Sequence, residues 1–498
     1  MSTMPPQFPL EIRSALRRAS STVYFHCSIG TVTPPSFRHR TTLFRPRAFS
    51  SSSVKLPTKP SLCTADELHY VSVPNSDWRL ALWRYLPPPQ APTRNHPLLL
   101  LSGVGTNAIG YDLSPGCSFA RHMSGQGFET WILEVRGAGL STRVSDLKDV
   151  EESAHELSNR IESTARAAAD DTQLYERFNE IRSKLLSLIE SRQNSGLVNQ
   201  IRDLAQRLVN LFDDGQRSVS PPLIDLQERL TATIEDFQKQ LDLIVKYDWD
   251  FDHYLEEDVP AAIEYVRAQS KPKDGKLFAI GHSMGGILLY AMLSRCAFEG
   301  REPSVAAVAT LASSVDYTTS DSALKLLIPL ANPAEALSVP VVPLGALLAA
   351  AFPLSTRPPY VLSWLNDLIS STDMMHPELL EKLVLNNFCT IPAKLLIQLT
   401  TAFREGGLRD RSGKFSYKDH LPRTSVPVLA LAGDRDLICP PAAVEDTVKL
   451  FPENLVTYKL LGEPEGPHYA HYDLVGGRLA VEQVYPCITE FLSHHDSA

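Results

Sequence analysis

Apolar positions along the chain follow two different periods, which alternate through most of it. Short apolar or alternating runs of strand length, bounded by turn residues, occupy 69–73, 80–85, 97–101, 130–135, 276–280, 305–312, 426–432 and 455–461. Stretches with the spacing of a helix lie between some of these runs, at 118–126, 287–294 and 441–451. Strands that alternate with helices are typical of a parallel sheet. The pattern therefore predicts an α/β fold, preceded by an antiparallel hairpin of the first two strands.

Residues 144–246 depart from this rhythm. Apolar side chains recur there at helical spacing among charged ones, for example at Leu174, Phe178 and Ile181. Breaks near Asn194 and Ser220 divide the stretch into three amphipathic helices. An apolar stripe has to be buried against something. This predicted helical insertion therefore packs on its own protein or serves as the interface for a protein partner.

A second departure follows the strand at 305–312. A long apolar segment rich in Leu, Ala and Pro runs from Leu324 to Leu399, and its prolines favour several short helices over one long helix. We predict a cap over 321–420, whose apolar lining either suits an acyl chain or only shields the site from water. The remaining segments of the predicted core are 63–143, 247–320 and 421–498.

The first 62 residues differ from the rest in composition. They contain nine Lys and Arg residues but one acidic residue, Glu11, and are rich in Ser, Thr and Pro. This composition predicts a disordered transit peptide for an organelle. Its Ser-rich character favours the chloroplast or another plastid, whereas Arg47 to Ser50 is similar to a mitochondrial cleavage site, so a mitochondrion is the alternative destination.

Charge and cysteine content narrow the function classes. The formal net charge is −9, and residues 63–498 carry 39 basic against 56 acidic side chains. Such an acidic body has no electrostatic attraction to DNA or RNA, so we predict no nucleic-acid partner. The seven cysteines form no CxxC pair, and neither a phosphate-binding loop nor a dinucleotide motif occurs, so we expect no metal and no cofactor. The longest apolar stretch, 337–354, contains three prolines and predicts no membrane-spanning helix, which leaves peripheral membrane contact open.

The sharpest chemical signal is the sequence Gly-His-Ser-Met-Gly-Gly at 281–286. It follows an apolar strand and precedes a helical run, which is the context of a G-x-S-x-G nucleophile elbow. Glycines on both sides of Ser283 permit a tight turn, and the start of the following helix favours developing negative charge. Ser283 is therefore the candidate nucleophile.

A serine nucleophile needs a base, and the base needs an acid that orients it. Both are expected after the serine in chain order. The strand at 426–432 opens onto a loop with Asp434 and Asp436, and the loop after the last strand carries His468 and His471. Because the carboxyl ends of parallel strands share one edge of the sheet, one acid and one histidine are expected beside Ser283.

The motifs around these residues resemble the acid lipases, a group of α/β-hydrolases, and the related polyhydroxyalkanoate synthases; within this group we expect a plant organellar hydrolase. The resemblance rests on residues 112–141, on the Tyr-Asp-Trp-Asp-Phe-Asp sequence at 247–252 and on the elbow, and it covers roughly 68–141 and 247–494. It implies the α/β-hydrolase fold, a mostly parallel central sheet with helices on both faces. The family's G-x-x-D-x-x-x-P pattern makes Asp436 the acid, and its His-x-Asp motif makes His471 the base. Asp434 and His468 are the alternatives.

The resemblance also implies an oxyanion hole formed by the backbone N–H groups of Val104 and Met284. The chain departs from the lipases at Ser102, where they usually have His, and this leaves the support of the hole in question. Serine at the elbow, in place of the cysteine of the synthases, points to ester hydrolysis or acyl transfer.

We therefore expect a serine hydrolase that cleaves a carboxylic ester, either a lipid or another small molecule with an apolar acyl group. An acyltransferase is an alternative that uses the same triad and acyl-enzyme but passes the acyl group to an alcohol. A non-catalytic binding or scaffold protein on this fold, with the helical insertion as its interface, is the third hypothesis.

Overall fold

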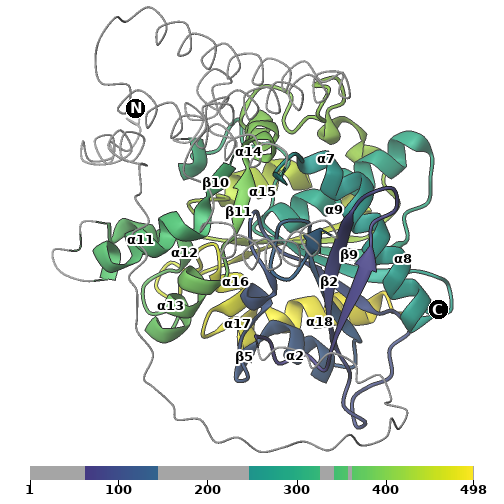
Figure 1. Ribbon diagram of the computed structural model, residues 1–498, viewed down its shortest axis with the longest axis horizontal. Coiled ribbons are helices and arrows are strands. Elements are labelled where there is room, and N and C mark those ends of the chain that lie inside the picture. Colours follow the sequence, from purple (N-terminus) through teal and green to yellow (C-terminus); the bar gives the residue numbers. More distant parts are fainter. Residues whose placement is uncertain (1–61, 144–245, 326–340, 357–359, 361, 497–498) are drawn as a thin grey trace, which may run out of the picture. The chain divides into compact units, whose positions relative to one another are not determined.

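The computed structural model describes residues 62–143, 246–325, 341–356, 360 and 362–496 (Figure 1). Apart from Leu62 and Lys246, the predicted transit peptide (1–62) and the predicted helical insertion (144–246) lie outside the described residues. The fold is therefore given for the predicted core and for most of the predicted cap.

A central sheet contains nine of the described strands in the order β1-β2-β6-β3-β8-β9-β12-β13, with β7 paired to β2. From β6 to β13 along that order neighbouring strands are parallel, whereas β2 is antiparallel to β1 and to β6. The bounds are Glu67–Ser72 (β1), Trp78–Tyr85 (β2), Leu98–Leu101 (β3), Thr130–Glu134 (β6), Thr142–Arg143 (β7), Leu277–His282 (β8), Val305–Leu311 (β9), Val428–Gly433 (β12) and Val456–Leu461 (β13). All except β7 were expected from the sequence to within two residues at either end. The predicted α/β fold is confirmed.

Helices cover both faces of this sheet, with α2 and α18 on one face and α8, α9 and α15 on the other (Figure 1). The four residues of β3 are buried on both sides, which explains why that strand is a continuous run of leucine. On the first face the rings of Phe119 and Tyr485 meet edge to face, with centroids 4.9 Å apart. The bounds are Phe119–Gly125 (α2), Val259–Ser270 (α8), Met284–Glu299 (α9), Pro441–Val448 (α15) and Tyr485–His494 (α18).

The chain between β9 and β12, here called the β9–β12 connection, contains the predicted cap. Its described part has short helices, as the prolines predict, and a small antiparallel pair of strands. They are β10 (Val341–Pro343), α11 (Leu344–Thr356), α12 (Trp364–Ile369), α13 (Pro377–Asn386), β11 (Thr390–Pro392), α14 (Ala393–Leu399), η4 (Thr400–Phe403) and η5 (Tyr417–Arg423). In the part of the chain that the structure describes, no helix is both long and apolar enough to cross a bilayer.

The remaining short elements lie in the turns around the core. They are η1 (Ala108–Tyr111), β4 (Asp112–Ser114), β5 (Cys117–Ser118), α7 (Phe251–His253), η2 (Tyr254–Asp258), η6 (Glu453–Leu455), α16 (Asp473–Gly476) and α17 (Ala480–Gln483).

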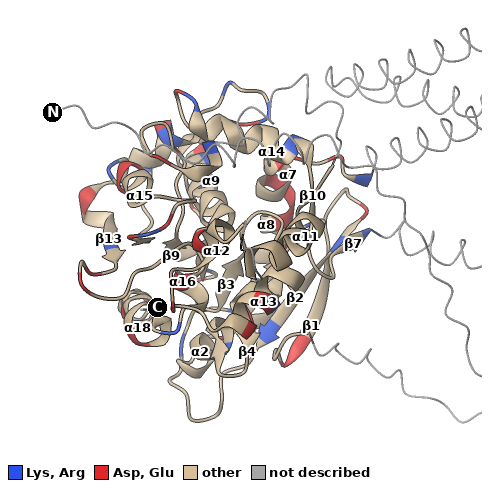
Figure 2. Ribbon diagram, turned by 90° about the vertical axis from the view of Figure 1, so that its left-hand side faces the viewer, with Lys and Arg blue, Asp and Glu red and all other residues tan. Residues whose placement is uncertain are grey.

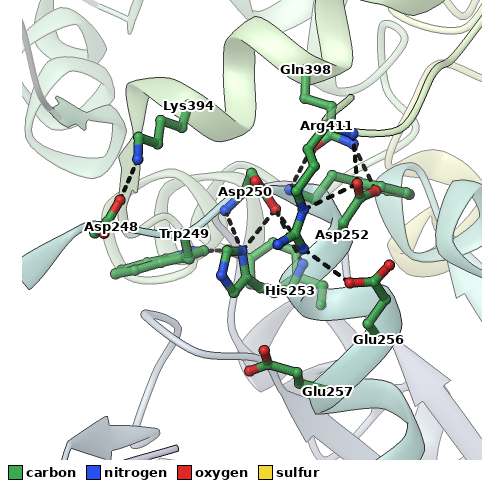
Figure 3. Close-up of polar contacts among 12 residues, drawn as sticks. Asp248, Trp249, Asp250, Asp252, His253, Glu256, Glu257, Lys394, Gln398 and Arg411 are labelled. Carbon is green, nitrogen blue, oxygen red and sulfur yellow. Dashed lines mark hydrogen bonds and ion pairs between the residues drawn. The ribbon is translucent and has the colours of Figure 1, made fainter. Parts of the chain in front are cut away.

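A cluster of ion pairs fixes one end of the β9–β12 connection to the core (Figure 3). Lys394 of α14 pairs with Asp248. Gln398, on the same helix, donates to Asp252 at 2.7 Å. Further along the connection, the Arg411 side chain pairs with three carboxylates, those of Asp250, Asp252 and Glu256. The acidic sequence at 247–252 therefore acts in this structure as an anchor for the connection.

Candidate active site

Ser283 occupies the turn between β8 and α9. Its backbone adopts φ 55° and ψ −121°, a strained combination for a residue with a side chain, with a typical cost of about 1–3 kcal/mol. The turn is tight enough that a Cβ added to Gly281 would lie 2.3 Å from the carbonyl carbon of Gly285. A Cβ added to Gly285 would lie 2.1 Å from the carbonyl oxygen of Leu101 in β3. The glycines of the motif are thus required sterically, and they hold the predicted elbow against the sheet.

Asp436 and His471 meet across two loops. Asp436 lies in the loop after β12, and its Oδ2 is 2.8 Å from Nδ1 of His471 in the loop after β13. Oδ1 of the same carboxylate accepts hydrogen bonds from the backbone N–H groups of Ile438 and Cys439, both at 2.8 Å. Both side chains are almost fully buried. A carboxylate can only accept at this position, so the hydrogen-bond network assigns the proton of a neutral His471 to Nδ1 and leaves Nε2 without one.

The two alternative residues form a pair of their own. Asp434 Oδ2 lies 2.6 Å from Nδ1 of His468, and Asp434 Oδ1 accepts a hydrogen bond from the backbone N–H of Tyr469 at 2.8 Å. The His468 side chain is 32% exposed, compared with 4% for His471. The structure thus sorts the four candidates into a buried pair, Asp436 with His471, and a more exposed pair, Asp434 with His468.

His282, which precedes Ser283, connects the turn at Ser283 to the buried pair. Its Nε2 lies 2.9 Å from the backbone carbonyl oxygen of His471, and the two rings have centroids 4.7 Å apart. Burial lowers the pKa of His282 to about 3, so its imidazole is neutral and donates to that carbonyl. The bond holds the histidine loop beside Ser283. The Ser283 hydroxyl itself has no hydrogen-bond partner among the described residues, and catalytic contacts of this kind often form only when substrate binds.

The loop after β3, residues 102–107, lies against Ser283. A Cβ added to Gly103 would be 3.3 Å from Cβ of Ser283, and Val104 is the next residue after Gly103. The Thr106 hydroxyl donates to the Gly103 carbonyl at 2.9 Å and closes the turn. Met284 begins α9, and a first-turn N–H has no acceptor within its own helix. The Val104 and Met284 amides therefore come from two segments that border Ser283.

Sequence reasoning did not single out Glu134, which supports these loops. Buried Glu134, at the end of β6, accepts hydrogen bonds from the N–H groups of Ala108 and Leu140 at 3.0 and 2.7 Å. Burial is the largest influence on this carboxyl and raises its pKa. No local motif marks Glu134, because its partners lie in two separate turns.

Buried Asp473, the Asp of the His-x-Asp motif, lies two positions after His471, and nothing in the sequence indicated its partners. Its carboxylate accepts hydrogen bonds from Ser370 Oγ at 2.5 Å, from the Ser371 N–H at 2.8 Å and from the Ala470 N–H at 2.7 Å. Burial raises the pKa of Asp473 to about 6. The β9–β12 connection is thereby bound to the histidine loop. In the described ranges, no group of three or more His, Cys, Asp or Glu side chains is arranged to hold a metal ion.

The fold and the site define a class of protein: an α/β protein with a serine on a strained strand-to-helix turn and a buried Asp–His pair beside it. The chain belongs to the α/β-hydrolase fold family, whose sequence pattern matches residues 96–473.

Solved structures with a similar fold include a membrane phospholipase A described as a bacterial virulence factor, at 14% identity over 87% of each chain, with a TM-score of 0.43. A Saccharomyces cerevisiae monoglyceride lipase variant is 13% identical over 89% of this chain and 100% of its own, with a TM-score of 0.43. An esterase from Thermogutta terrifontis is 13% identical over 86% of this chain and 100% of its own, with a TM-score of 0.42. At this similarity they carry no argument about the substrate. A comparison with curated proteins finds no match.

Proposed function

We propose that the protein is a serine hydrolase that cleaves a carboxylic ester of a lipid or another apolar acyl compound. The observation that carries the proposal is the buried Asp436–His471 pair, held at 2.8 Å and bound through the His471 carbonyl to His282, the neighbour of Ser283. A nucleophile, a base with a free Nε2 and an acid that orients the base are the three groups that acyl transfer through serine needs.

In the proposed reaction the Ser283 hydroxyl attacks the acyl carbon while Nε2 of His471 takes its proton. The imidazolium then gives that proton to the leaving alcohol, and Asp436 stabilises the charged ring throughout. The N–H groups of Val104 and Met284 stabilise the oxyanion, at about 3 kcal/mol for each donor. Water activated by His471 releases the acid and restores Ser283.

The composition of the β9–β12 connection favours a substrate with an apolar acyl group. Its helix α11 contains no Lys, Arg, Asp or Glu and is therefore uniformly tan in Figure 2. Leu347 and Leu354 on this helix are 44% and 50% exposed. An uncharged helix with exposed leucines fits the handling of an acyl chain better than that of a charged substrate.

The test is hydrolysis of p-nitrophenyl esters with acyl chains from two to sixteen carbons by the full-length protein, with Ser283→Ala as the control. We expect turnover that rises with chain length and is lost in the variant. Equal turnover by both proteins would refute the proposal. A new ester formed in the presence of an added alcohol, in preference to free acid, would instead identify an acyltransferase.

A further inference from the structure

One short segment of the β9–β12 connection, residues 387–389, pairs with the loop that carries the proposed oxyanion donor Val104. The Cys389 N–H donates to the Gly105 carbonyl at 2.7 Å, and the Asn107 N–H donates to the Asn387 carbonyl at 3.0 Å. These two bonds flank an antiparallel bridge between Thr106 and Phe388. The loop at 102–107, here called the oxyanion loop, therefore lies between the turn that joins β8 to α9 and the connection.

The side chain of Asn387 adds a link of a different kind. Its Oδ1 accepts a hydrogen bond from the Gly110 N–H, and its Nδ2 donates to the Tyr472 hydroxyl, both at 3.0 Å. Gly110 lies in η1, directly after the oxyanion loop, and Tyr472 is the neighbour of His471. The Asn387 side chain is fully buried. One buried amide thus joins the two halves of the site, the half that stabilises the oxyanion and the half that holds the base.

The packing beside this amide leaves a gap. A cavity of about 10 Å³, enough for the centre of about one water molecule, lies there between the two loops. Its lining comes from residues 102, 103 and 106 of the oxyanion loop and from Gly110, Tyr111, His282, Asn387, Tyr472 and Val475. Asn387 lines this gap together with residues of both loops, and its two hydrogen bonds, to Gly110 and to Tyr472, link the loops across it.

We propose that Asn387 is a positioning residue that sets the separation between the oxyanion loop and His471. This assignment rests on the proposed serine hydrolase activity. It also bears on Ser102, where the lipases that the chain resembles usually have His, and where the support of the oxyanion hole was in question. The Ser102 hydroxyl makes one long contact, at 3.4 Å, with the Asn107 carbonyl. Support for the oxyanion loop comes instead from the connection, through residues 387–389.

The proposal is tested with Asn387→Ala in the full-length protein. The matched control is Asn386→Ala, which makes the same chemical change one residue away, at an exposed side chain that bonds only the Lys382 carbonyl. Turnover of p-nitrophenyl butyrate and the rate constant of labelling by a fluorophosphonate are measured, each normalised to the fraction of protein finally labelled. Since a displacement of about 1 Å in a catalytic group can cost about 100-fold, we expect kcat of Asn387→Ala to fall about 10- to 100-fold.

The expected KM stays within about threefold of the parent value, and the labelling rate falls in the same proportion as kcat, because the substrate still binds but the oxyanion and the base are misaligned. Asn386→Ala should match the parent protein. A merely structural role would reduce the labelled fraction and the melting temperature but leave turnover per labelled site unchanged, and that result would overturn the proposal.

If Asn387→Ala does not fold, the proposal is tested with Tyr472→Phe. This variant removes one of the two hydrogen bonds of the Asn387 side chain and retains the ring that packs on His282, with centroids 4.7 Å apart. A kcat at least about threefold lower at an unchanged melting temperature would support the proposal, and an unchanged kcat would overturn it. If the protein is not a serine hydrolase, the result is different: the parent protein itself would not be labelled, and the proposed role of Asn387 would be refuted as well.

Discussion

Replacement of Asp436 by asparagine probes the buried pair most sharply, because the structure fixes how the new amide must lie. Two backbone N–H groups, those of Ile438 and Cys439, point at Oδ1 at 2.8 Å. An NH₂ group cannot accept these bonds, so the amide oxygen of Asp436→Asn takes the Oδ1 position. The NH₂ group then takes the Oδ2 position and donates to Nδ1 of His471.

The imidazole of the variant must therefore carry its proton on Nε2, the atom that has to accept the proton of Ser283. Serine enzymes trapped in this wrong tautomer lose about 10⁴-fold in kcat, which is about 5 kcal/mol of transition-state stabilisation. We expect a loss of that order for Asp436→Asn in the hydrolysis of p-nitrophenyl butyrate at pH 7.5. The melting temperature should change little, because the volume and all backbone contacts are retained.

The matched control is Asp434→Asn, the same substitution two residues earlier in the same loop. Its partner His468 belongs to the more exposed pair, so we expect kcat within about threefold of the parent value. A loss of less than about tenfold in Asp436→Asn would refute the reasoning from the tautomer. A large loss in Asp434→Asn with little change in Asp436→Asn would show that the acid and the base are Asp434 and His468.

Further predictions concern stability. Because burial raises the pKa of Asp473 from its usual 3.8 to about 6, the folded protein should lose stability relative to Asp473→Asn as the pH rises from about 4 to about 6. The change should be complete above that range, and urea unfolding at pH 4.5 and pH 7.5 should show the stability difference between the two proteins shift by about 2 kcal/mol. Gly285→Ala should lower the melting temperature, because its Cβ would overlap the backbone of β3, whereas Gly125→Ala, with open space around it, should not. Asp258→Ala leaves the buried guanidinium of Arg136 without its fully buried partner, and urea unfolding should register a loss of about 3–5 kcal/mol.

The sequence was sufficient for features with local signatures. The elbow could be predicted because a strand, a glycine-flanked serine and a helix are adjacent in the chain, and the structure has β8, Ser283 and α9 in that order. The strands could be predicted because burial on both faces demands continuous apolar runs, as in β3. Spacing alone did not distinguish Asp434 from Asp436 or His468 from His471, since both members of each pair share a loop. That distinction depends on how two distant loops fit together.

Asn387 was missed for a related reason. Its partners Gly110 and Tyr472 are 277 and 85 residues away in the chain, so no spacing or motif links them. The one available signal was the pair of asparagines at 386 and 387 between the apolar residues 383–385 and 388–389, where a polar side chain needs a buried partner. The plastid destination of residues 1–62 and the role of residues 144–246 stay predictions, since those segments, except Leu62 and Lys246, lie outside the described residues.

The central claim is that Ser283 is an activated nucleophile. The most direct measurement is to treat the full-length protein with a fluorophosphonate probe and to locate the modified residue by peptide mass spectrometry, with Ser283→Ala in parallel. We predict stoichiometric modification of Ser283 in the parent protein and no modification of the variant. Labelling of a different residue, equal labelling of both proteins, or no labelling of the folded parent protein would contradict the claim.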